Sequence, residues 1–394
     1  MKTRNSRRAF IKKGALAGLA IPLVGSGLMS CQTKEKKEST TTQKPNKKLN
    51  ILILGGTSFL GPHQIAYAIS RGHKVSTFTR GKTIPTVNKD AFKHVEQLIG
   101  DRENNLKALE NRTWDVVIDN SGRNVQWTKD TANLLKDNAG LYMYTSSTGV
   151  YYPYKGDHIK EDTKLILEMP DGLTEDEKYE QDYGIMKGNS ELETIKAFGK
   201  ERSIIIRPTY MIGPADRTNR FVHWPLRFAK GGKILVPGKH DDLVQYVDVR
   251  DVAEWYIRLA ENKQYGTYNA VGPEATQTVH EFATKAAKTF DVESTFTMVD
   301  DYEFLKSNSI YFAIPWVMAE DNHYGSARID HQSAMNAGLT YRPLKDTVKD
   351  TYDWWMSNAV AKDRKQKYHS DPNSLLAKEK DILASWGKHQ KTKG

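Results

Sequence analysis

The sequence has only one cysteine, Cys31, among its 394 residues. An internal disulfide is therefore impossible, and a thiol nucleophile is excluded from everything that follows Cys31. The eleven histidines form no H-E-x-x-H motif or comparable ligand spacing, so we expect no metal site. The chain also lacks the repeated long apolar runs of a polytopic membrane protein, and a mean hydropathy of −0.64 fits a soluble globule.

The formal net charge of +10 comes entirely from the N-terminal segment. Residues 1–48 hold 12 basic and 2 acidic side chains, whereas residues 49–394 hold 46 of each. A folded part without net charge is poor evidence for an affinity for phosphate backbones. We therefore expect no nucleic-acid partner.

The first 30 residues have the pattern of an export signal. A basic segment precedes the apolar run 14–29, which is too short and glycine-rich to span a bilayer comfortably. Residues 6–12 (S-R-R-A-F-I-K) resemble the twin-arginine translocation motif, and residues 28–31 (L-M-S-C) resemble a lipoprotein cleavage site. We expect a signal peptide over 1–30 and export by the twin-arginine route, to the periplasm or to a membrane through a lipid on Cys31. An ordinary signal-peptidase site is the alternative.

Residues 31–48 contain no apolar side chain to bury, apart from Cys31 and the ring of Pro45, and are expected to form a flexible tether. The apolar run 49–54 then has the pattern of a strand buried on both faces. Glycines 55, 56 and 61 follow it at once, and a helical pattern follows them. Strand, glycine turn and helix together place backbone amides where a pyrophosphate can bind.

This segment resembles the G-x-x-G-x-x-G fingerprint of extended short-chain dehydrogenases/reductases, the NAD-dependent epimerase/dehydratase family, with Ser58 replacing the middle glycine. The likeness covers about residues 49–360. It implies an α/β fold with a Rossmann-type doubly wound parallel sheet over 49–207. A smaller, mainly substrate-binding α/β part with returning sheet elements would follow over 208–360, and a helical tail over 361–394.

The resemblance also implies a set of cofactor-binding residues at the carboxyl ends of the strands. In NAD-preferring members an acidic residue ends the second strand, where this chain has Thr79 followed by Arg80 and Lys82. Two cations in place of a carboxylate favour NADP slightly over NAD. The expected cofactor contacts are Gly55, Thr57, Ser58, Phe59, Leu60, Gly61, Thr79, Arg80, Lys82, Asp101, Asn120, Ser121, Gly122, Lys187 and Pro208.

The catalytic residues implied by the resemblance are Ser147, Tyr183 and Lys187. Residues 146–151 (S-S-T-G-V-Y) are similar to the family's S-S-x-x-V-Y segment, and Tyr183 and Lys187 fit its Y-x-x-x-K motif. Residues four apart share a helix face, so the lysine can sit beside the phenol. A phenol ordinarily titrates near pH ~10, and a neighbouring cation lowers that value toward neutrality. Tyr183 would then exchange a proton with a substrate hydroxyl while Ser147 holds the same oxygen.

Two features depart from the family's pattern. Ser147 and Tyr183 are 36 positions apart, more than the roughly 25 usual in the family, and we interpret residues 152–182 as an insertion at the mouth of the site, with a lid as one role. Thr148 and Gly149 replace the Asp-Glu pair of sugar-nucleotide 4,6-dehydratases, which argues against their reaction.

The substrate contacts expected from position between the two halves are aromatic or hydrogen-bonding side chains. The expected contacts are Tyr151, Tyr210, Arg220, His223, Trp224 and Gln245. Each of these residues could equally serve core packing.

Residues 375–386 predict an amphipathic helix that packs on the domain.

These observations favour an exported enzyme that acts on a small carbohydrate or polyol. Little free NAD(P) is available outside the cytoplasm, so we expect a tightly held cofactor and a redox-neutral, epimerase-like reaction. A net NADP-dependent reductase is the alternative. A non-catalytic RNA-binding protein is a third reading, because the same motifs look like those of chloroplast stem-loop-binding relatives. The sequence leaves the oligomeric state and the substrate's identity open.

Overall fold

The computed structural model describes residues 47–319 and 324–393. The expected signal peptide, the lipid-anchor residue Cys31 and nearly all of the tether therefore lie outside the described residues. Within the described ranges, no helix combines the length and the apolar character needed to cross a membrane.

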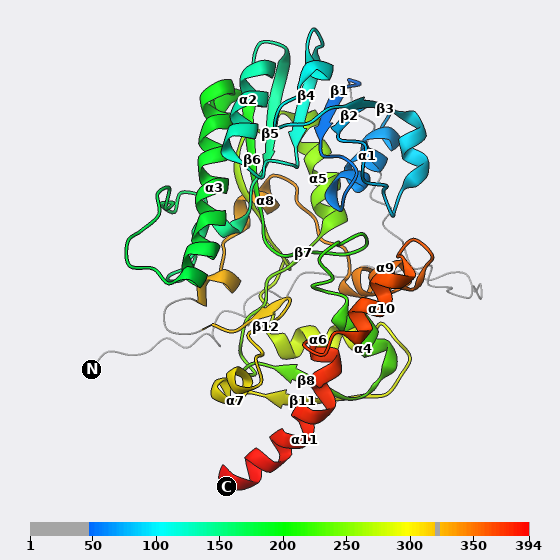
Figure 1. Cartoon of the computed structure of the whole chain (residues 1–394), viewed down its shortest axis with the longest axis vertical. Coiled ribbons are helices and arrows are strands. Elements are labelled where there is room, and N and C mark those ends of the chain that lie inside the picture. The colour runs from blue at the N-terminus through cyan, green and yellow to red at the C-terminus, as the bar shows by residue number, and fades with distance from the viewer. Residues whose placement is uncertain (1–46, 320–323, 394) are drawn as a thin grey trace, which may run out of the picture. The chain divides into compact units, whose positions relative to one another are not determined.

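A seven-stranded parallel sheet forms the larger half of the structure (Figure 1). Its strand order, β10-β6-β5-β4-β1-β2-β3, reverses direction between β1 and β4. The loops after these two strands diverge, and such a switch point is where open α/β sheets bind ligands. The expected Rossmann-type fold is confirmed. The strands are β1 (Asn50–Leu54), β2 (Lys74–Thr79), β3 (Val95–Ile99), β4 (Trp114–Asp119), β5 (Ala139–Thr145), β6 (Ser203–Pro208) and β10 (Gly266–Ala270).

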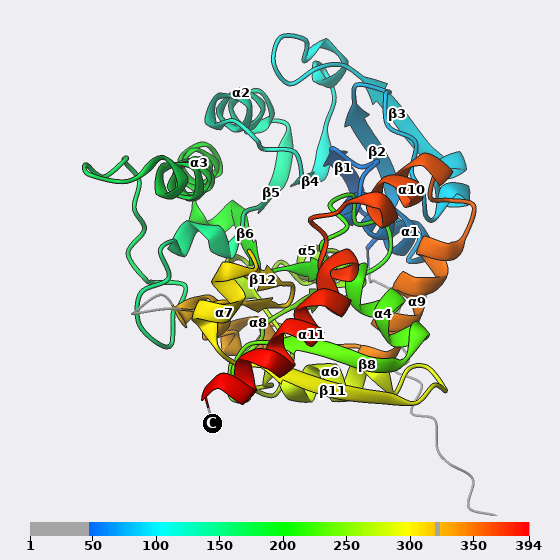
Figure 2. The same cartoon turned by 60° about the horizontal axis from the view of Figure 1, so that its bottom comes forward.

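Helices cover both faces of the sheet, because its central strands are apolar on both sides. In β1, Ile51 and Ile53 enter the core beneath one pair of helices, and Leu52 and Leu54 enter the core beneath the other. Figure 2 shows the two helical layers on opposite sides of the sheet. The first layer holds α1 (Leu60–Ser70) and α5 (Val249–Asn262), and the second holds α2 (Val125–Leu135) and α3 (Glu175–Phe198).

The chain that follows β6 builds a smaller α/β part around its own core, in which Trp224, Phe228 and Trp316 are fully buried. Strands β8 and β11 pair in parallel there, β7 pairs with β9, and β12 pairs with β13. The chain also returns to the large sheet through α5 and β10. The elements of this part are β7 (Met211–Ile212), α4 (His223–Lys230), β8 (Gly232–Pro237), β9 (Val247–Asp248), α6 (Val279–Ala287), β11 (Ser294–Val299), α7 (Tyr302–Ser307), β12 (Phe312–Ala313), β13 (Trp316–Val317), α8 (Gln332–Asn336) and α9 (Leu344–Met356).

The C-terminal tail forms two helices, α10 (Lys362–Ser370) and α11 (Leu375–Lys393). Ile382 and Trp386 of α11 are buried in the smaller core, so the expected amphipathic helix is confirmed and is longer than the predicted stretch. Glu379 accepts a hydrogen bond from Leu235 N at 2.9 Å and forms a buried ion pair with Arg227. The tail is therefore an integral part of the fold.

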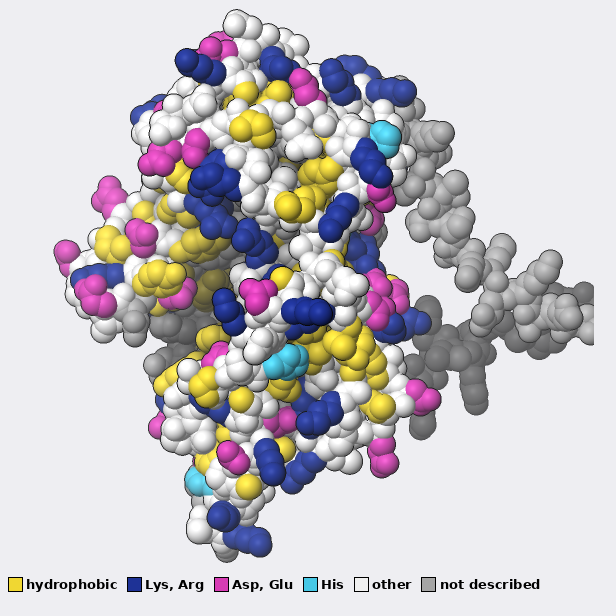
Figure 3. All heavy atoms as spheres, turned by 45° about the vertical axis from the view of Figure 1, so that its right-hand side comes forward, with side chains coloured by type: hydrophobic (Ala, Val, Ile, Leu, Met, Phe, Trp, Pro, Cys, Tyr) yellow, Lys and Arg dark blue, Asp and Glu magenta, His cyan; other side chains and the backbone are white. Residues whose placement is uncertain are grey.

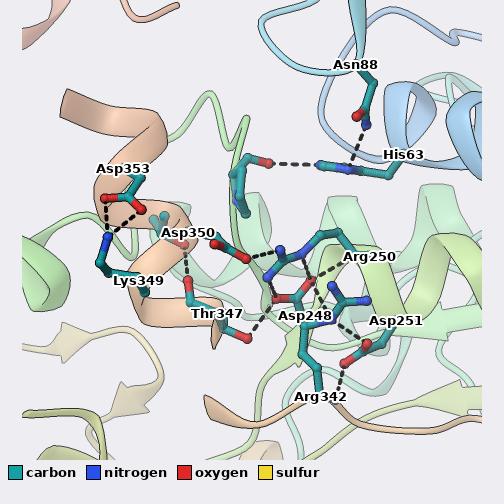
Figure 4. Close-up of polar contacts among 12 residues, drawn as sticks. His63, Asn88, Asp248, Arg250, Asp251, Arg342, Thr347, Lys349, Asp350 and Asp353 are labelled. Carbon is teal, nitrogen blue, oxygen red and sulfur yellow. Dashed lines mark hydrogen bonds and ion pairs between the residues drawn. The ribbon is translucent and has the colours of Figure 1, made fainter. Parts of the chain in front are cut away.

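A charged junction joins the two halves at the start of α5 (Figure 4). Asp248 caps that helix by accepting a hydrogen bond from Arg250 N at 2.7 Å, and Thr347 of α9 donates to the same carboxylate at 2.7 Å. Arg342 binds Asp251 at 2.6 Å. Burial and the neighbouring Asp248 raise the pKa of Asp251 to about 6. These bonds fix α9 and the segment before it to the start of α5, which packs on the sheet.

Candidate active site

The glycine turn after β1 has the close packing that its motif requires. Gly55 has φ +81°, and a Cβ there would lie 2.7 Å from Cβ of Ser121. A Cβ on Gly61 would collide with the backbone of Gly56. Phe59, with φ 44°, immediately precedes helix α1. The turn therefore leads directly from strand to helix, and Gly61 N donates to Ser58 O at 3.2 Å within it.

A pocket of about 270 Å³ opens over this turn. Three cations line it together with hydroxyl groups, and no carboxylate does. A dianionic diphosphate suits such a wall, so the residues present fit the phosphates of a dinucleotide. Four of the expected cofactor residues meet here, whereas Arg217 and Arg364 were not anticipated. The lining is Thr57, Ser58, Phe59, Pro62, Lys82, Thr83, Ile84, Thr86, Ala215, Arg217 and Arg364.

The ends of β3 and β4 are held by a buried ion pair between Arg102 and Asp119. Tyr142 also donates to Asp119 at 2.8 Å, and Arg102 donates to Oγ of Ser121 at 3.2 Å. The sequence assigned no role to this pair, although Arg102 directly follows the expected contact Asp101. The pair shapes the strand-end loops, and the carboxylate of Asp101 caps Glu103 N at 3.1 Å.

The remaining expected cofactor residues lie at strand ends along the same edge. Asn120 uses its amide to bridge Gln64 at 2.6 Å and Thr145 at 2.8 Å, so its side chain serves the fold. Thr79 caps Gly81 N at 3.1 Å, and Arg80 is exposed. The carbonyl of Pro208, the last residue of β6, accepts a hydrogen bond from Thr148 at 3.4 Å.

Ser147 and Tyr183 meet at a contact between a short 3-10 turn (Thr148–Tyr151) and helix α3. A Cβ built on Gly149 would lie 2.9 Å from Cε1 of Tyr183 and 3.2 Å from Oγ of Ser147. A Cβ on Gly184 would lie 2.6 Å from the carbonyl oxygen of Gly149. Two glycines thus let the helix approach the turn and bring the phenol ring and the hydroxyl together. Tyr183 is 44% exposed, which leaves it open to a substrate.

Lys187 lies one turn further along α3 and is buried. Its Nζ donates to the carbonyl oxygens of Gly122 at 3.1 Å and Thr145 at 2.9 Å, at the ends of β4 and β5. Nζ also lies 5.0 Å from the centre of the Tyr144 ring. Burial lowers the pKa of the ammonium to about 8. The lysine therefore ties helix α3 to the ends of β4 and β5.

Helix α3 begins earlier than the sequence analysis allowed. Thr174 caps it, with a capping box in which Glu177 bonds back to the backbone of Thr174. Residues 175–182 are thus the first two turns of the helix, and the irregular segment is 152–174. The T-x-x-E signal was present in the sequence. The segment is anchored to the fold: Asp330 N donates to Ile159 O at 2.8 Å, and Asn189 donates to Leu167 O at 2.9 Å.

A buried polar network lies next to the turn that carries Ser147. Ser146, the neighbour of Ser147, donates to Glu191 of α3, and Glu191 pairs with Arg207 of β6 at 2.6 Å. Arg207 donates to the hydroxyl of Tyr151 at 2.7 Å, and that hydroxyl donates to Asn269 at 2.8 Å. Tyr151 was expected to contact substrate, but only 6% of it is exposed and its hydroxyl is used within the fold.

Two more of the expected substrate contacts serve the structure. Trp224 is fully buried, and its indole N–H donates to Ile314 O at 2.9 Å, so it packs the smaller core. Gln245 exchanges two hydrogen bonds with the backbone of Ile329, at 2.9 and 3.0 Å. Sequence position alone could not show this, because both roles depend on partners about 80 to 90 residues away in the chain.

The other three expected contacts differ in their surroundings. His223 is buried, neither ring nitrogen has a hydrogen bond within the described residues, and burial lowers its pKa to about 3. Tyr210 is half-buried, and Arg220 is exposed and pairs with Asp216 at 3.6 Å. Burial raises the pKa of Tyr210, and the charges of Arg220 and Glu180 act on it as well. Burial raises the pKa of the Tyr154 phenol, and the nearby Tyr210, Glu180 and Tyr183 raise it further.

Comparison with known proteins agrees with this architecture. The 41 kDa chloroplast stem-loop binding protein b of Arabidopsis thaliana is 28% identical over 230 residues, which are 54% of this chain. The match spans just over half, 56%, of that relative's length. Among solved structures, WbmH of Bordetella bronchiseptica in complex with NAD+ has a TM-score of 0.57 at 15% identity and covers 80% of this chain and 100% of its own.

UDP-glucose 4-epimerase of Bifidobacterium longum, solved with NAD+ and UDP, has a TM-score of 0.55 at 17% identity and covers 78% of this chain and 98% of its own. At such identities the likeness establishes the fold. The model of the NAD dependent epimerase/dehydratase family matches residues 51–271, which include the glycine turn, Ser147, Tyr183 and Lys187. The chain belongs to the NAD dependent epimerase/dehydratase family.

Proposed function

We propose that this protein is a dinucleotide-dependent enzyme that transfers hydride to and from a carbohydrate, with Tyr183 as its acid and base. The observation that carries the proposal is the meeting of Tyr183 and Ser147 at Gly149, on the same sheet edge as the glycine turn. The dinucleotide, when bound, accepts hydride from a carbinol carbon or returns it. The protein's own side chains transfer the proton and position the substrate.

The proton chemistry belongs to Tyr183, since its ring is exposed at the site while the neighbouring lysine is buried. The phenol oxygen takes the proton of a substrate hydroxyl as the carbon becomes a carbonyl, and it returns the proton when the carbonyl is reduced. Ser147 donates a hydrogen bond to the same substrate oxygen and fixes its position. Lys187, one turn further along the same helix, binds the carbonyl oxygens of Gly122 and Thr145 and so positions the helix that carries Tyr183.

We propose a redox-neutral reaction, such as an epimerisation or an oxidation-assisted bond cleavage. Its basis is the export pattern of residues 1–31, because a protein outside the cytoplasm has little free dinucleotide to exchange. Twin-arginine export carries folded proteins with their cofactor, and Cys31 would then hold the protein at a membrane. Nucleotide sugars are cytoplasmic, so the proposed substrate is a free sugar, a glycoside or a glycan fragment. A net reductase remains the alternative enzyme.

Two observations bear on which dinucleotide is held. The solved neighbours are named as complexes with NAD, which favours NAD. Thr79 in place of a carboxylate, with Lys82 in the pocket wall, instead suits a 2′-phosphate. We propose NAD as the resident cofactor and NADP as the alternative. Because the 2′-phosphate adds about two charges, the two differ in mass and in salt-dependent affinity.

The decisive experiment identifies what the purified protein carries. The mature chain is purified without added nucleotide, denatured, and the released small molecules are identified and counted by mass spectrometry. Near one NAD or NADP per chain supports a retained cofactor and a redox-neutral cycle. An empty protein that binds NADPH reversibly would instead support a net reductase and overturn the argument from export.

The chloroplast relative's name raises RNA binding as a second candidate. Residues 49–394 carry no net charge, and Figure 3 shows basic and acidic side chains interspersed over the face it presents. Binding to phosphate backbones weakens steeply with salt. Titration with a stem-loop RNA at two salt concentrations therefore tests this candidate: tight, salt-sensitive binding would favour it over the enzyme.

A further inference from the structure

We propose that Arg217 and Arg364 form a clamp over the diphosphate of the bound dinucleotide, and that helix α10 of the C-terminal tail thereby sets how long the cofactor stays bound. This inference rests on the proposed function. It concerns the two arginines that line the pocket over the glycine turn. The sequence predicted no role for either residue. Neither arginine belongs to the expected motifs.

Arg364 is held in place from both sides. Its guanidinium lies 5.3 Å from the ring of Trp354 and 5.6 Å from that of Trp355. Nη2 donates to Asp216 O at 2.5 Å, and Nε donates to Asn219 Oδ1 at 3.1 Å. Its remaining nitrogen, Nη1, has no hydrogen bond within the described residues, which leaves its two N–H groups available.

Helix α10 is itself fixed to the end of α9. Lys365 donates to the carbonyl oxygen of Ser357 at 2.8 Å, and the ring of Tyr368 packs 5.2 Å from that of Trp355. Trp354 donates to Oγ of Thr86 at 3.3 Å, and Thr86 lines the same pocket. Helix α9 therefore reaches the loop after β2, and Arg364 of α10 lines the same pocket as that loop. Figure 3 shows several Lys and Arg side chains around the middle of the face seen from this side.

The charges around Arg364 are poorly balanced. Arg217 is exposed and has no hydrogen bond or ion pair within the residues that the structure describes. Burial lowers the pKa of Arg364, and the positive charge of Arg217 lowers it further against the effect of Asp216. Two guanidinium groups that repel one another across a pocket without a carboxylate favour an anion between them. The same pocket is lined by Thr57, Ser58 and Phe59, which belong to the turn that binds diphosphate in this type of fold.

The test measures cofactor release rather than turnover. The full chain is loaded with NADH and mixed with excess NAD+, and the loss of energy transfer from tryptophan to bound NADH gives the release rate. The release rate is compared between the wild type and four variants: Arg217→Gln, Arg364→Gln, Arg364→Lys and Lys367→Gln. Lys367 lies on the same helix and is exposed, away from the pocket lining, so its variant controls for the loss of one charge.

We expect release to become about tenfold faster or more in both glutamine variants, since each loses charge-assisted hydrogen bonds to phosphate. Arg364→Lys should recover part of the loss, and Lys367→Gln should match the wild type. Calorimetric titration should show weaker binding of ADP-ribose, which contains the diphosphate, and unchanged binding of AMP.

Three results would overturn the clamp. Release rates equal to the wild type in both glutamine variants would overturn it while leaving the proposed function intact. A loss confined to NADPH, with NADH unaffected, would reassign the arginines to a 2′-phosphate. A wild-type chain that binds no dinucleotide would overturn the proposed function and the clamp together. Thermal unfolding of each variant identifies any protein that has failed to fold.

Discussion

Tyr183 packs against Gly149 so closely that a Cβ at position 149 would lie 2.9 Å from its ring. The same Cβ would lie 3.2 Å from Oγ of Ser147. The distance between Tyr183, the proposed acid and base, and the Ser147 hydroxyl therefore depends on the missing side chain of Gly149. Gly149 has no positive φ, so alanine could adopt its backbone conformation, and space alone is limiting.

Gly149→Ala should accordingly separate folding from catalysis. The added methyl group displaces Tyr183, and a misplacement of about 1 Å can cost about 100-fold in kcat. Overpacking at one site costs roughly 1–3 kcal/mol of stability. Gly387→Ala is the control, since a Cβ there meets nothing within 4 Å. Steady-state rates and urea unfolding of both variants test this; normal turnover in Gly149→Ala would show that the glycine contact is irrelevant to the reaction.

Tyr183→Phe should lose turnover but keep its cofactor. The ring and its packing remain, while proton transfer, worth about 10²- to 10⁴-fold, is removed. Dinucleotide release on denaturation and thermal unfolding should match the wild type. If the variant loses its cofactor or unfolds at a lower temperature, Tyr183 has a structural role instead.

Lys187 makes stability depend on pH in a defined direction. Its pKa falls from 10.5 to about 8 because it is buried, so between these values the folded protein binds fewer protons than the unfolded chain. Wild-type stability should therefore rise with pH across this window relative to Lys187→Met, by roughly 3 kcal/mol at about 1.4 kcal/mol per pKa unit. Below pH 8 the difference in unfolding free energy between the wild type and Lys187→Met should stay constant. Unfolding of both proteins by urea at pH 7.5 and pH 10.5 measures it, and a pH-independent difference would contradict the assignment.

Glu191 and Arg207 should show strong coupling. Glu191→Leu leaves the buried Arg207 guanidinium without its counter-ion, which costs about 3–5 kcal/mol. The double variant Glu191→Leu, Arg207→Leu removes both charges and should be more stable than the single variant Glu191→Leu. Urea unfolding of the single and double variants gives the coupling energy. Asp90→Ala, which removes a fully exposed ion pair with Lys93, should leave unfolding unchanged.

Local patterns predicted the parts of the site that neighbouring residues determine. An apolar run, a glycine turn and a helix start define the strand-to-helix crossing at residues 49–61, and the Y-x-x-x-K spacing puts Tyr183 and Lys187 on one helix face. The capping box at Thr174 was also readable, and with it the true start of α3. These features follow from backbone geometry and from interactions within a few residues.

The sequence by itself therefore determined the fold and the family, and it predicted Ser147, Tyr183 and Lys187 as the catalytic residues. Only the tertiary structure decided that Tyr151, Trp224 and Gln245 are used by the fold, because their partners come from distant segments. It also decided that Arg364 reaches the glycine turn, about 300 residues away in the chain. Which cations line a pocket that contains no carboxylate depends on how the whole chain packs.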